Sequence, residues 1–147
     1  MIRFMLDTDI CIYLLNRRPG HEHILKRMDG RSYGEILLSA IALAELRYGI
    51  AASQRREANR AKLELFLAQF EVVSFDEVAA AVYGLIRAHL RAKGTPIDPL
   101  DTLLAGHAKA VGATLVTNNT AEFSRVPELA LENWLEPIEA TCLNKLS

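Results

Sequence analysis

The stretch DPLDTLLAGHAKAVGATLVT, residues 98–117, contains a helix and a strand together with the signals that separate them. Asp98 can cap a helix that has Pro99 at its first position, and Gly112 follows the last helical residue. The apolar run at 113–117 then predicts a buried strand. A helix that leads directly into a buried strand is the repeating unit of α/β proteins, so this stretch predicts the fold class.

The same alternation of strand and helix extends over most of the chain. Short apolar runs predict strands at 2–6, 35–39, 70–75 and 113–117, and a fifth near 135–139. Capped or amphipathic segments predict helices at 9–16, 40–52, 55–69, 76–94 and 98–112. Residues 17–23 are the most loop-like segment. Near-continuous apolar strands are typical of a sheet covered on both faces, so we expect an α/β domain with a mostly parallel central sheet of four to five strands.

Length and composition limit the possible classes of protein. The 147 residues suit one domain, expected at 1–139, with a tail at 140–147. Lys and Arg number 17 against 18 Asp and Glu, which excludes a nucleic-acid binder that acts through bulk positive charge. Two cysteines are too few for a disulfide framework, and no apolar run reaches the ~18 residues of a membrane span. We therefore expect a cytoplasmic protein that makes no membrane contact.

Three acidic residues border apolar sequence, and two of them, Glu45 and Asp101, have no Lys or Arg three or four positions away. Asp7 follows the first predicted strand, Glu45 is the only charged residue between Ile36 and Leu46, and Asp101 lies in the first turn of the helix predicted at 98–112. A bare buried carboxylate costs several kcal/mol, so each acid must be protonated, reach water or meet a cation. If the fold brings them together, a divalent cation would relieve their repulsion, and oxygen ligands suit Mg²⁺ or Mn²⁺.

Each of these residues also has a structural interpretation. Asp7 could serve as a turn residue, and Glu45 could simply emerge from its helix into water. Asp9 and Asp98 stand directly before predicted helices, which favours a capping role for both. His107 is expected to be structural, because it lies on a different helix face from the acid in its own helix.

Three segments of the chain, taken together, resemble a known family. They are MLDTDICIYLL (5–15), LSAIALAELRYGI (38–50) and IDPLDTLLAGHAKAVGATLVTNNTAEFSRVPELALENW (97–134). In order and spacing they resemble the PIN domain, and within it the VapC toxins of type II toxin–antitoxin pairs. The resemblance implies a three-layer α/β/α domain that acts as an endoribonuclease dependent on Mg²⁺ or Mn²⁺. Such a toxin hydrolyses phosphodiester bonds in RNA, with tRNA a candidate substrate, and inhibits translation and growth.

The resemblance also assigns the acidic residues. It implies that Asp7, Glu45 and Asp101 are catalytic and bind metal, Glu45 directly or through water. The family often has Asp where this chain has Asn119, and Glu122 stands where a further acid is common. A neutral amide binds a hard cation less strongly than a carboxylate, so the fourth ligand stays open between Asn119 and Glu122.

The remaining implications concern binding partners. RNA would need a local basic surface on a chain that is nearly neutral, and the candidates are Arg17, Arg18, Arg55, Arg56 and Arg60. The resemblance implies a VapB-type antitoxin that lies along a hydrophobic groove between the early helices and points a basic side chain at the acids. It further implies a homodimer and contact with DNA only through the antitoxin.

Two other functions compete with this interpretation. A strand followed by the sequence DTD is similar to the haloacid-dehalogenase-like phosphatases, although Cys11 stands where Thr or Val is usual and the later paired-acid motif is missing. The second alternative is a non-catalytic PIN-like RNA-binding domain whose site has decayed at Asn119.

Overall fold

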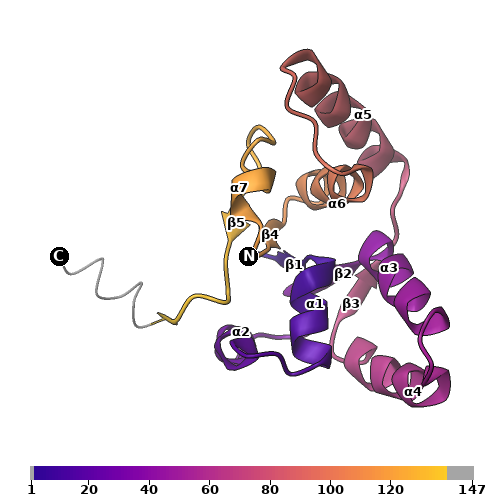
Figure 1. Cartoon of the computed structure of the whole chain (residues 1–147). Helices are drawn as coiled ribbons and strands as arrows, with labels where there is room; N and C mark the ends of the chain where they lie inside the picture. Colours follow the sequence, from indigo (N-terminus) through magenta and orange to yellow (C-terminus); the bar gives the residue numbers. More distant parts are fainter. Residues whose placement is uncertain (1, 139–147) are drawn as a thin grey trace.

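The computed structural model describes residues 2–138, and within them the strands form a single parallel sheet (Figure 1). The strand order is β3-β2-β1-β4-β5, and every neighbouring pair is parallel. The strands are β1 (Phe4–Leu6), β2 (Ile36–Ser39), β3 (Glu71–Val73), β4 (Thr114–Val116) and β5 (Leu131–Glu132). The prediction of an α/β domain with a mostly parallel sheet is confirmed.

Helices connect these strands and flank the sheet. They are α1 (Thr8–Leu15), α2 (His21–Met28), α3 (Ala40–Ala51), α4 (Arg56–Leu67), α5 (Glu77–Ala92), α6 (Pro99–Ala110) and α7 (Thr120–Phe123). Figure 1 shows α1, α2 and α4 on one side of the sheet and α5 and α6 on the other, which gives three layers. No helix among the described residues is both long enough and apolar enough to cross a membrane.

The structure differs from the sequence predictions in two connecting segments. The segment 17–23 is not all loop, because α2 begins at His21. The fifth strand near 135–139 is also wrong: β5 lies at Leu131–Glu132, and residues 135–138 form no strand. A strand of two residues shows no alternation of apolar and polar positions, so it carries no sequence signal. Residue 139 and the predicted tail at 140–147 lie outside the described residues.

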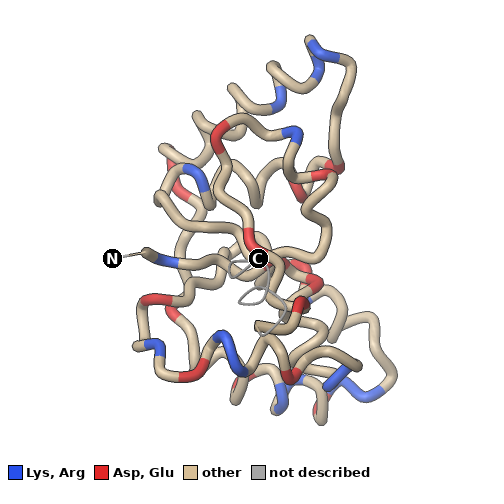
Figure 2. Tube along the Cα trace, turned by 90° about the vertical axis from the view of Figure 1, so that its left-hand side faces the viewer, with Lys and Arg blue, Asp and Glu red and all other residues tan. Residues whose placement is uncertain are grey.

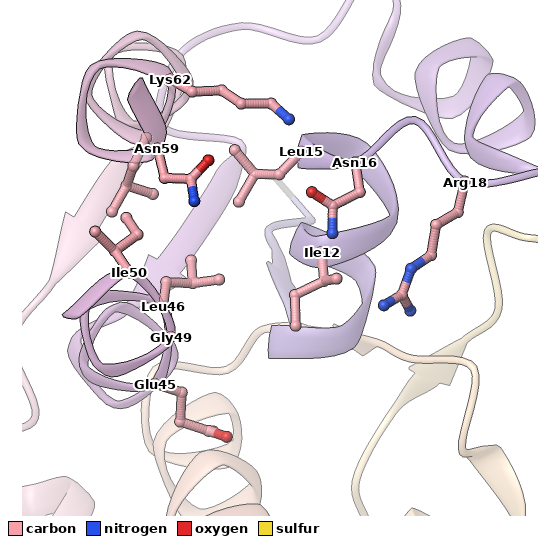
Figure 3. A pocket seen from close by; sticks show the side chains of 11 residues that line it. Ile12, Leu15, Asn16, Arg18, Glu45, Leu46, Gly49, Ile50, Asn59 and Lys62 are labelled. Atoms are coloured by element: carbon pink, nitrogen blue, oxygen red, sulfur yellow. The ribbon is translucent and has the colours of Figure 1, made fainter. Parts of the chain in front are cut away.

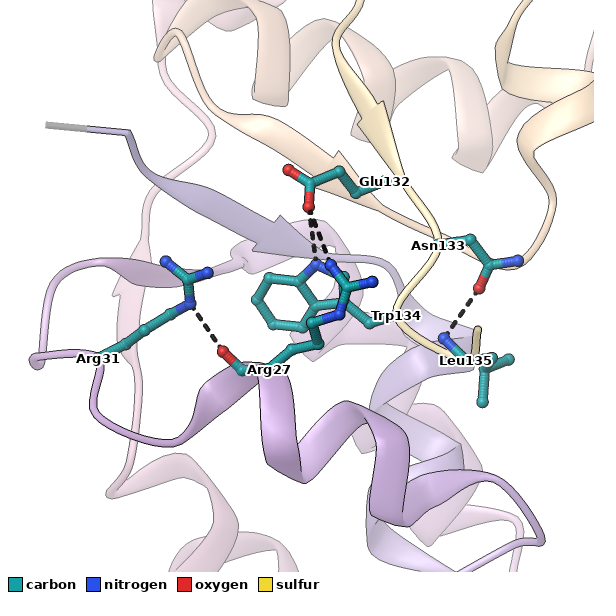
Figure 4. A network of polar contacts seen from close by, with 6 residues as sticks. All are labelled: Arg27, Arg31, Glu132, Asn133, Trp134 and Leu135. Carbon is teal, nitrogen blue, oxygen red and sulfur yellow. Dashed lines mark hydrogen bonds and ion pairs between the residues drawn. The ribbon is translucent and has the colours of Figure 1, made fainter. Parts of the chain in front are cut away.

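The core forms around β1, the middle strand. Phe4, Met5 and Leu6 are all buried, because helices cover both faces of a strand that also has a neighbour on each side. The last described segment closes the core near the start of this strand (Figure 4). Trp134 packs against Phe4 and donates a 3.2 Å hydrogen bond from Nε1 to Glu132 Oε1.

Arginines from the α2 region hold this closing segment in place. The Arg31 guanidinium lies 4.4 Å from the ring centre of Phe4 and 5.5 Å from that of Trp134. Arg27 adds an ion pair to Glu132 at 3.7 Å. An ion pair therefore joins β5 to α2, and stacking joins the segments that follow these two elements.

Helices α5 and α6 approach each other closely at one glycine. A Cβ atom placed on Gly106 would lie 3.0 Å from both the Cα and the backbone nitrogen of Tyr83. Backbone atoms cannot move aside as a flexible side chain can, so the contact between α5 and α6 requires the absence of a side chain at 106.

We predict that Gly106→Ala destabilises the protein, because the added methyl group forces the two helices apart. Overpacking of this kind costs about 1–3 kcal/mol, which urea unfolding would detect. Gly84→Ala is the matched control in α5, where an added Cβ meets no atom within 4 Å. It is expected to stabilise the helix by about 0.5–1 kcal/mol. Equal midpoints for the two variants would contradict the close approach at Gly106.

Candidate active site

Asp7 lies at the carboxyl end of β1 and is held from several directions. Its backbone N–H donates to the carbonyl of Val116 in β4 at 3.0 Å. Its Oδ1 accepts a hydrogen bond from the backbone N–H of Ile10 at 2.9 Å, which makes Asp7 the cap of α1. The prediction that Asp9 caps this helix is wrong. The helix begins one residue earlier than predicted, at Thr8. Thr8 is polar, so the apolar pattern used for the prediction does not mark it as helical.

Burial strongly changes the acidity of Asp7, whose side chain is 6% exposed. Desolvation raises the pKa of Asp7 to about 6, and the negative charges of Asp9 and Glu45 add to the rise. Hydrogen bonds from the Thr117 side chain and the Ile10 backbone oppose it. At neutral pH the charged form of Asp7 is therefore destabilised by its surroundings, and a bound cation would stabilise it.

Glu45 reaches the same edge of the sheet from α3. Its Oε1 accepts a 2.9 Å hydrogen bond from the hydroxyl of Thr8, the residue next to Asp7. Glu45 is partly exposed, and no Lys, Arg or His forms an ion pair with it among the described residues. Thr8 therefore links the second candidate acid to the first, while Oε2 of Glu45 is left for water or an ion.

Asp101 reaches this edge from the first turn of α6. Asp98 caps the helix as predicted, with Oδ1 accepting from the backbone N–H groups of Leu100 at 2.9 Å and Asp101 at 3.4 Å. The pKa of Asp101 is raised to about 7. Burial is the largest cause, and the negative charges of Glu122, Asp98, Asp7 and Glu45 contribute in that order. The fold therefore places these acids within electrostatic reach of one another.

The segment after β4 supplies Asn119 and Glu122. Asn119 is exposed at the start of α7, and its amide Nδ2 donates to Glu122 Oε2. Glu122 Oε1 accepts from the backbone N–H of Asp98 at 3.4 Å. Of the two, it is Glu122 whose charge acts on Asp101. Thr117, which sequence reasoning missed, lies beneath them: its hydroxyl accepts from the Asn119 backbone and donates to Asp7.

The donors at this edge fit a hard divalent cation in type. Carboxylate oxygens that face one another without a basic partner are the usual ligands of Mg²⁺ and Mn²⁺. Among residues 2–138, however, no three His, Cys, Asp or Glu side chains lie close enough together to hold an ion as they stand. The ligand set would therefore have to draw together around an ion.

His107 has no exposed surface and joins the two helices that carry Glu45 and Asp101. Ser39 Oγ accepts from the backbone N–H of Ile41 at 3.0 Å and lies 2.7 Å from His107 Nδ1. That hydroxyl can therefore donate its proton to Nδ1. Burial lowers the pKa of His107, which favours a neutral ring. The residue is structural, as expected, and fixes α6 against the start of α3.

A cavity of about 340 Å³ lies beside the acids, between α1, α3 and α4 (Figure 3). Apolar and polar side chains contribute almost equally to its walls, and Glu45 and Lys62 stand at opposite ends. The lining residues are Ile12, Leu15, Asn16, Arg18, Glu45, Leu46, Gly49, Ile50, Asn59, Lys62 and Leu63. The cavity lies between early helices, where the family resemblance implies a groove for an antitoxin, and that role stays a prediction.

The arginines predicted to contact RNA do not form one group. Arg18 lines the cavity that ends at Glu45. Arg17 lines a separate hollow that also involves residues of α2 and α4. Arg55, Arg56 and Arg60 are exposed at the start of α4. Of these five, only Arg18 shares a cavity with a candidate catalytic residue, and RNA contact by all five stays a prediction.

Comparison with known proteins identifies relatives of nearly the same length. The sequence profile of the PIN domain matches residues 4–129. Ribonuclease VapC2 of Rickettsia felis is 43% identical over 131 residues, which are 89% of this chain and 97% of that protein. The tRNA(fMet)-specific endonuclease VapC of Salmonella typhimurium is 42% identical over 134 residues, which are 91% of this chain and 99% of that protein.

A solved structure agrees with these matches. The crystal structure of VapBC2 from Rickettsia felis bound to a DNA fragment from their promoter contains a chain that superposes with a TM-score of 0.82. That chain is 43% identical, and the alignment covers 91% of this chain and 99% of the other. The similarity therefore extends over the sheet and over all the elements that carry the acids.

We predict that the crowded acids destabilise the metal-free protein as the pH rises. The pKa of Asp101 is raised from 3.8 to about 7, so the folded chain binds more protons than the unfolded chain between these values. Stability contributed by the protonated form is therefore lost as the pH rises through this window. At pH 8 in EDTA, Asp101→Asn should be more stable than the parent by on the order of 1 kcal/mol, allowing for solvent screening.

Urea unfolding in EDTA at several pH values measures this difference, which should shrink towards pH 4. Glu57→Gln removes an exposed acid that takes no part in raising the pKa of Asp101, and serves as the control. A gain for Asp101→Asn that is the same at pH 4 and pH 8 would contradict the electrostatic origin.

Proposed function

The chain belongs to the PIN-domain family, and we propose that it is a VapC-type toxin, a ribonuclease that hydrolyses phosphodiester bonds in RNA. The observation that carries this proposal is the convergence of Asp7, Glu45 and Asp101 on one edge of the sheet. Burial and the negative charges of neighbouring acids raise the pKa values of Asp7 and Asp101 there. A chain whose relatives cleave RNA and whose acids meet in this way has the parts of a nuclease. The phosphatase alternative has no support from the relatives, which are ribonucleases.

The cofactor is Mg²⁺ or Mn²⁺. Asp7 and Asp101 would hold the ion, with Glu45 binding it directly or through water. Glu122 is the better fourth ligand, because its carboxylate acts on Asp101 while the Asn119 amide donates to Glu122. The bound ion would lower the pKa of a water and neutralise charge on the phosphate.

The chain's own residues position these groups. The Asp7 carboxylate caps α1 through Oδ1 and also accepts the Thr117 hydroxyl, and these two hydrogen bonds fix its orientation toward a ligand. Thr8 holds one oxygen of Glu45, which leaves the other to orient the attacking water. Water that attacks phosphorus in line with the 3′ oxygen would break the P–O3′ bond, so the products would be a 5′-phosphate and, once the departing oxygen is protonated, a 3′-hydroxyl.

The substrate proposed is a structured RNA of the tRNA class. One relative is specific for tRNA(fMet), and its similarity covers nearly the whole of both chains. RNA of this kind is recognised through shape and exposed loops more than through its duplex sequence. The nearly neutral chain must therefore gather basic side chains locally around the acids.

The partner proposed is a VapB-type antitoxin. The cavity between α1, α3 and α4 presents apolar side chains that suit the apolar face of an inserted segment: Ile12, Leu15, Leu46, Ile50 and Leu63. Glu45 at its end would pair with a basic side chain of that segment, which would then compete with metal and substrate. The toxin would form a homodimer, and DNA contact would occur through the antitoxin; the related VapBC2 was crystallised on promoter DNA.

We predict that Asp7→Asn lowers RNA cleavage by about 10²-fold or more, because the variant removes a charge that the metal requires while an amide can still cap α1. Purified protein would be incubated with total tRNA and Mg²⁺ or Mn²⁺, and the products resolved on a gel. EDTA should abolish cleavage by the parent chain.

Asp9→Asn is the matched control, since Asp9 is an exposed acid two residues away that makes no cap contact. It should cleave at close to the parent rate. Cleavage that survives Asp7→Asn or EDTA would overturn the mechanism. RNA binding without cleavage by the parent chain would instead favour the non-catalytic RNA-binding domain.

We also predict that Ile12→Ala combined with Leu15→Ala weakens antitoxin binding by tenfold or more, because both side chains line the cavity. Binding of a VapB-type antitoxin would be measured by calorimetry. Leu65→Ala is the control: Leu65 is a 76% exposed apolar residue of α4 that does not line the cavity. Equal losses for the two variants would argue against the cavity as the docking site.

A further inference from the structure

The C-terminal half of α5 belongs to a stretch of the chain that has no acidic residue. Residues 78–97 contain no Asp or Glu, but they contain Arg87, Arg91 and Lys93, all of them exposed. Figure 2 shows these basic residues in blue at the upper end of α5, with no red residue until the chain reaches the start of α6. In a chain of net charge −1, this is a marked separation of charge.

This basic stretch forms a groove. A hollow of about 350 Å³ lies between α5 and the segment that leads into α6. Arg87 and Arg91 form its charged side, and its other walls are mostly apolar: Leu90, Pro96, Ile97 and Pro99, with Thr102 beside them. The same two arginines also border a second hollow on α5, beside Gly84, Ala88 and Ala92. Arg87 and Arg91 therefore lie between two hollows, either of which could hold part of a ligand.

The charges of these arginines are not neutralised within the described part of the chain. Arg87 donates from Nη1 to the hydroxyl of Tyr83 at 2.8 Å, which orients the guanidinium without cancelling its charge. Neither Arg87 nor Arg91 forms an ion pair with an acid of residues 2–138. By contrast, Arg47 is paired with Glu64 at 2.7 Å. The positive charge of the groove would therefore attract an anion from outside the chain.

The position of the groove relates it to the candidate active site. The segment that forms one wall continues directly into Asp98, the cap of α6, and α6 carries Asp101 in its first turn. A strand of RNA bound at the acids and extended past the start of α6 would meet Arg87 and Arg91. Guanidinium groups bind phosphate oxygens in pairs, and proline and aliphatic walls can contact the flat faces of ribose or base.

We propose that the Arg87–Arg91 groove binds the phosphodiester backbone of the RNA substrate on the α5 side of the scissile bond. The inference rests on the proposed function for its substrate class. It adds a surface on the face of the sheet opposite α1 and α4, away from the five arginines predicted from the sequence.

A second copy of the chain is the competing occupant of this face. A two-fold interface brings the same residues of both copies near the axis, so unpaired arginines of one copy would face those of the other. Like charges opposed in this way are unfavourable unless an anion lies between them. The charge of the groove therefore favours RNA.

The test compares Arg87→Gln/Arg91→Gln with the parent chain. Both substitutions keep a long polar side chain and remove the charge, so folding should be unaffected, which urea unfolding verifies. Binding of bulk tRNA is measured in EDTA, where no cleavage occurs, at several salt concentrations. We expect the variant to bind about tenfold more weakly, and the slope of log K against log salt to fall by about 1.4, or about 0.7 for each lost phosphate contact.

Arg47→Gln is the matched control, because that guanidinium is already paired with Glu64. It should leave both the affinity and the salt slope unchanged. In the cleavage assay with metal, Arg87→Gln/Arg91→Gln should raise KM about tenfold and leave kcat near the parent value, since neither arginine touches the reacting atoms.

Several results would overturn the proposal. An unchanged affinity and salt slope would do so, as would failure of the parent chain to bind tRNA at all. Loss of a dimer on size-exclusion chromatography with unchanged RNA affinity would assign the groove to a second copy. If the parent chain binds tRNA but does not cleave it, the proposed function fails, whereas the salt slope in EDTA still reports on the groove.

Discussion

Asp7 cannot move without disturbing three other parts of the molecule. Its backbone N–H completes the pairing of β1 with β4, its Oδ1 caps α1, and its side chain receives the Thr117 hydroxyl. The same carboxylate is buried beside other acids, which is unfavourable. Helix, sheet and threonine together keep it there, so the fold supplies the free energy that holds a negative charge at the edge of the sheet. The unfavourable burial of this charge is confined to the site, and a bound cation would remove it, which would strengthen binding of the cation.

The distribution of charge follows from that constraint. Acids gather at the carboxyl edge of the sheet, and basic side chains lie to either side of them, near Arg18 at the cavity and near Arg87 and Arg91 on α5. A nearly neutral chain can hold a polyanion in this way only if the two signs are kept apart. The buried contact between His107 and Ser39 helps to keep the two acid-bearing helices at a fixed spacing.

The sequence was most informative where a local rule determines a local structure. Asp98, Pro99 and Gly112 correctly predicted the bounds of α6, because caps and helix stops act within a few residues. The short β5 and the start of α2 left no periodic pattern, and Asp7 and Asp9 suit a cap equally well by residue type. The expected parallel sheet and the family resemblance both indicated that the acids could share one edge. The contact between Thr117 and Asp7 was not indicated, because residues so far apart in sequence meet only through the sheet.

The central position of β1 has a consequence for the order in which the protein is made. The first strand to leave the ribosome waits for β4, which belongs to the last third of the chain, before its second edge is paired. Asp7 then gains the Val116 carbonyl and the Thr117 hydroxyl, and α6 brings Asp101 at almost the same moment. Contacts this distant in sequence form late and slowly. The acidic edge of the sheet is therefore incomplete until more than two thirds of the described residues have been synthesised.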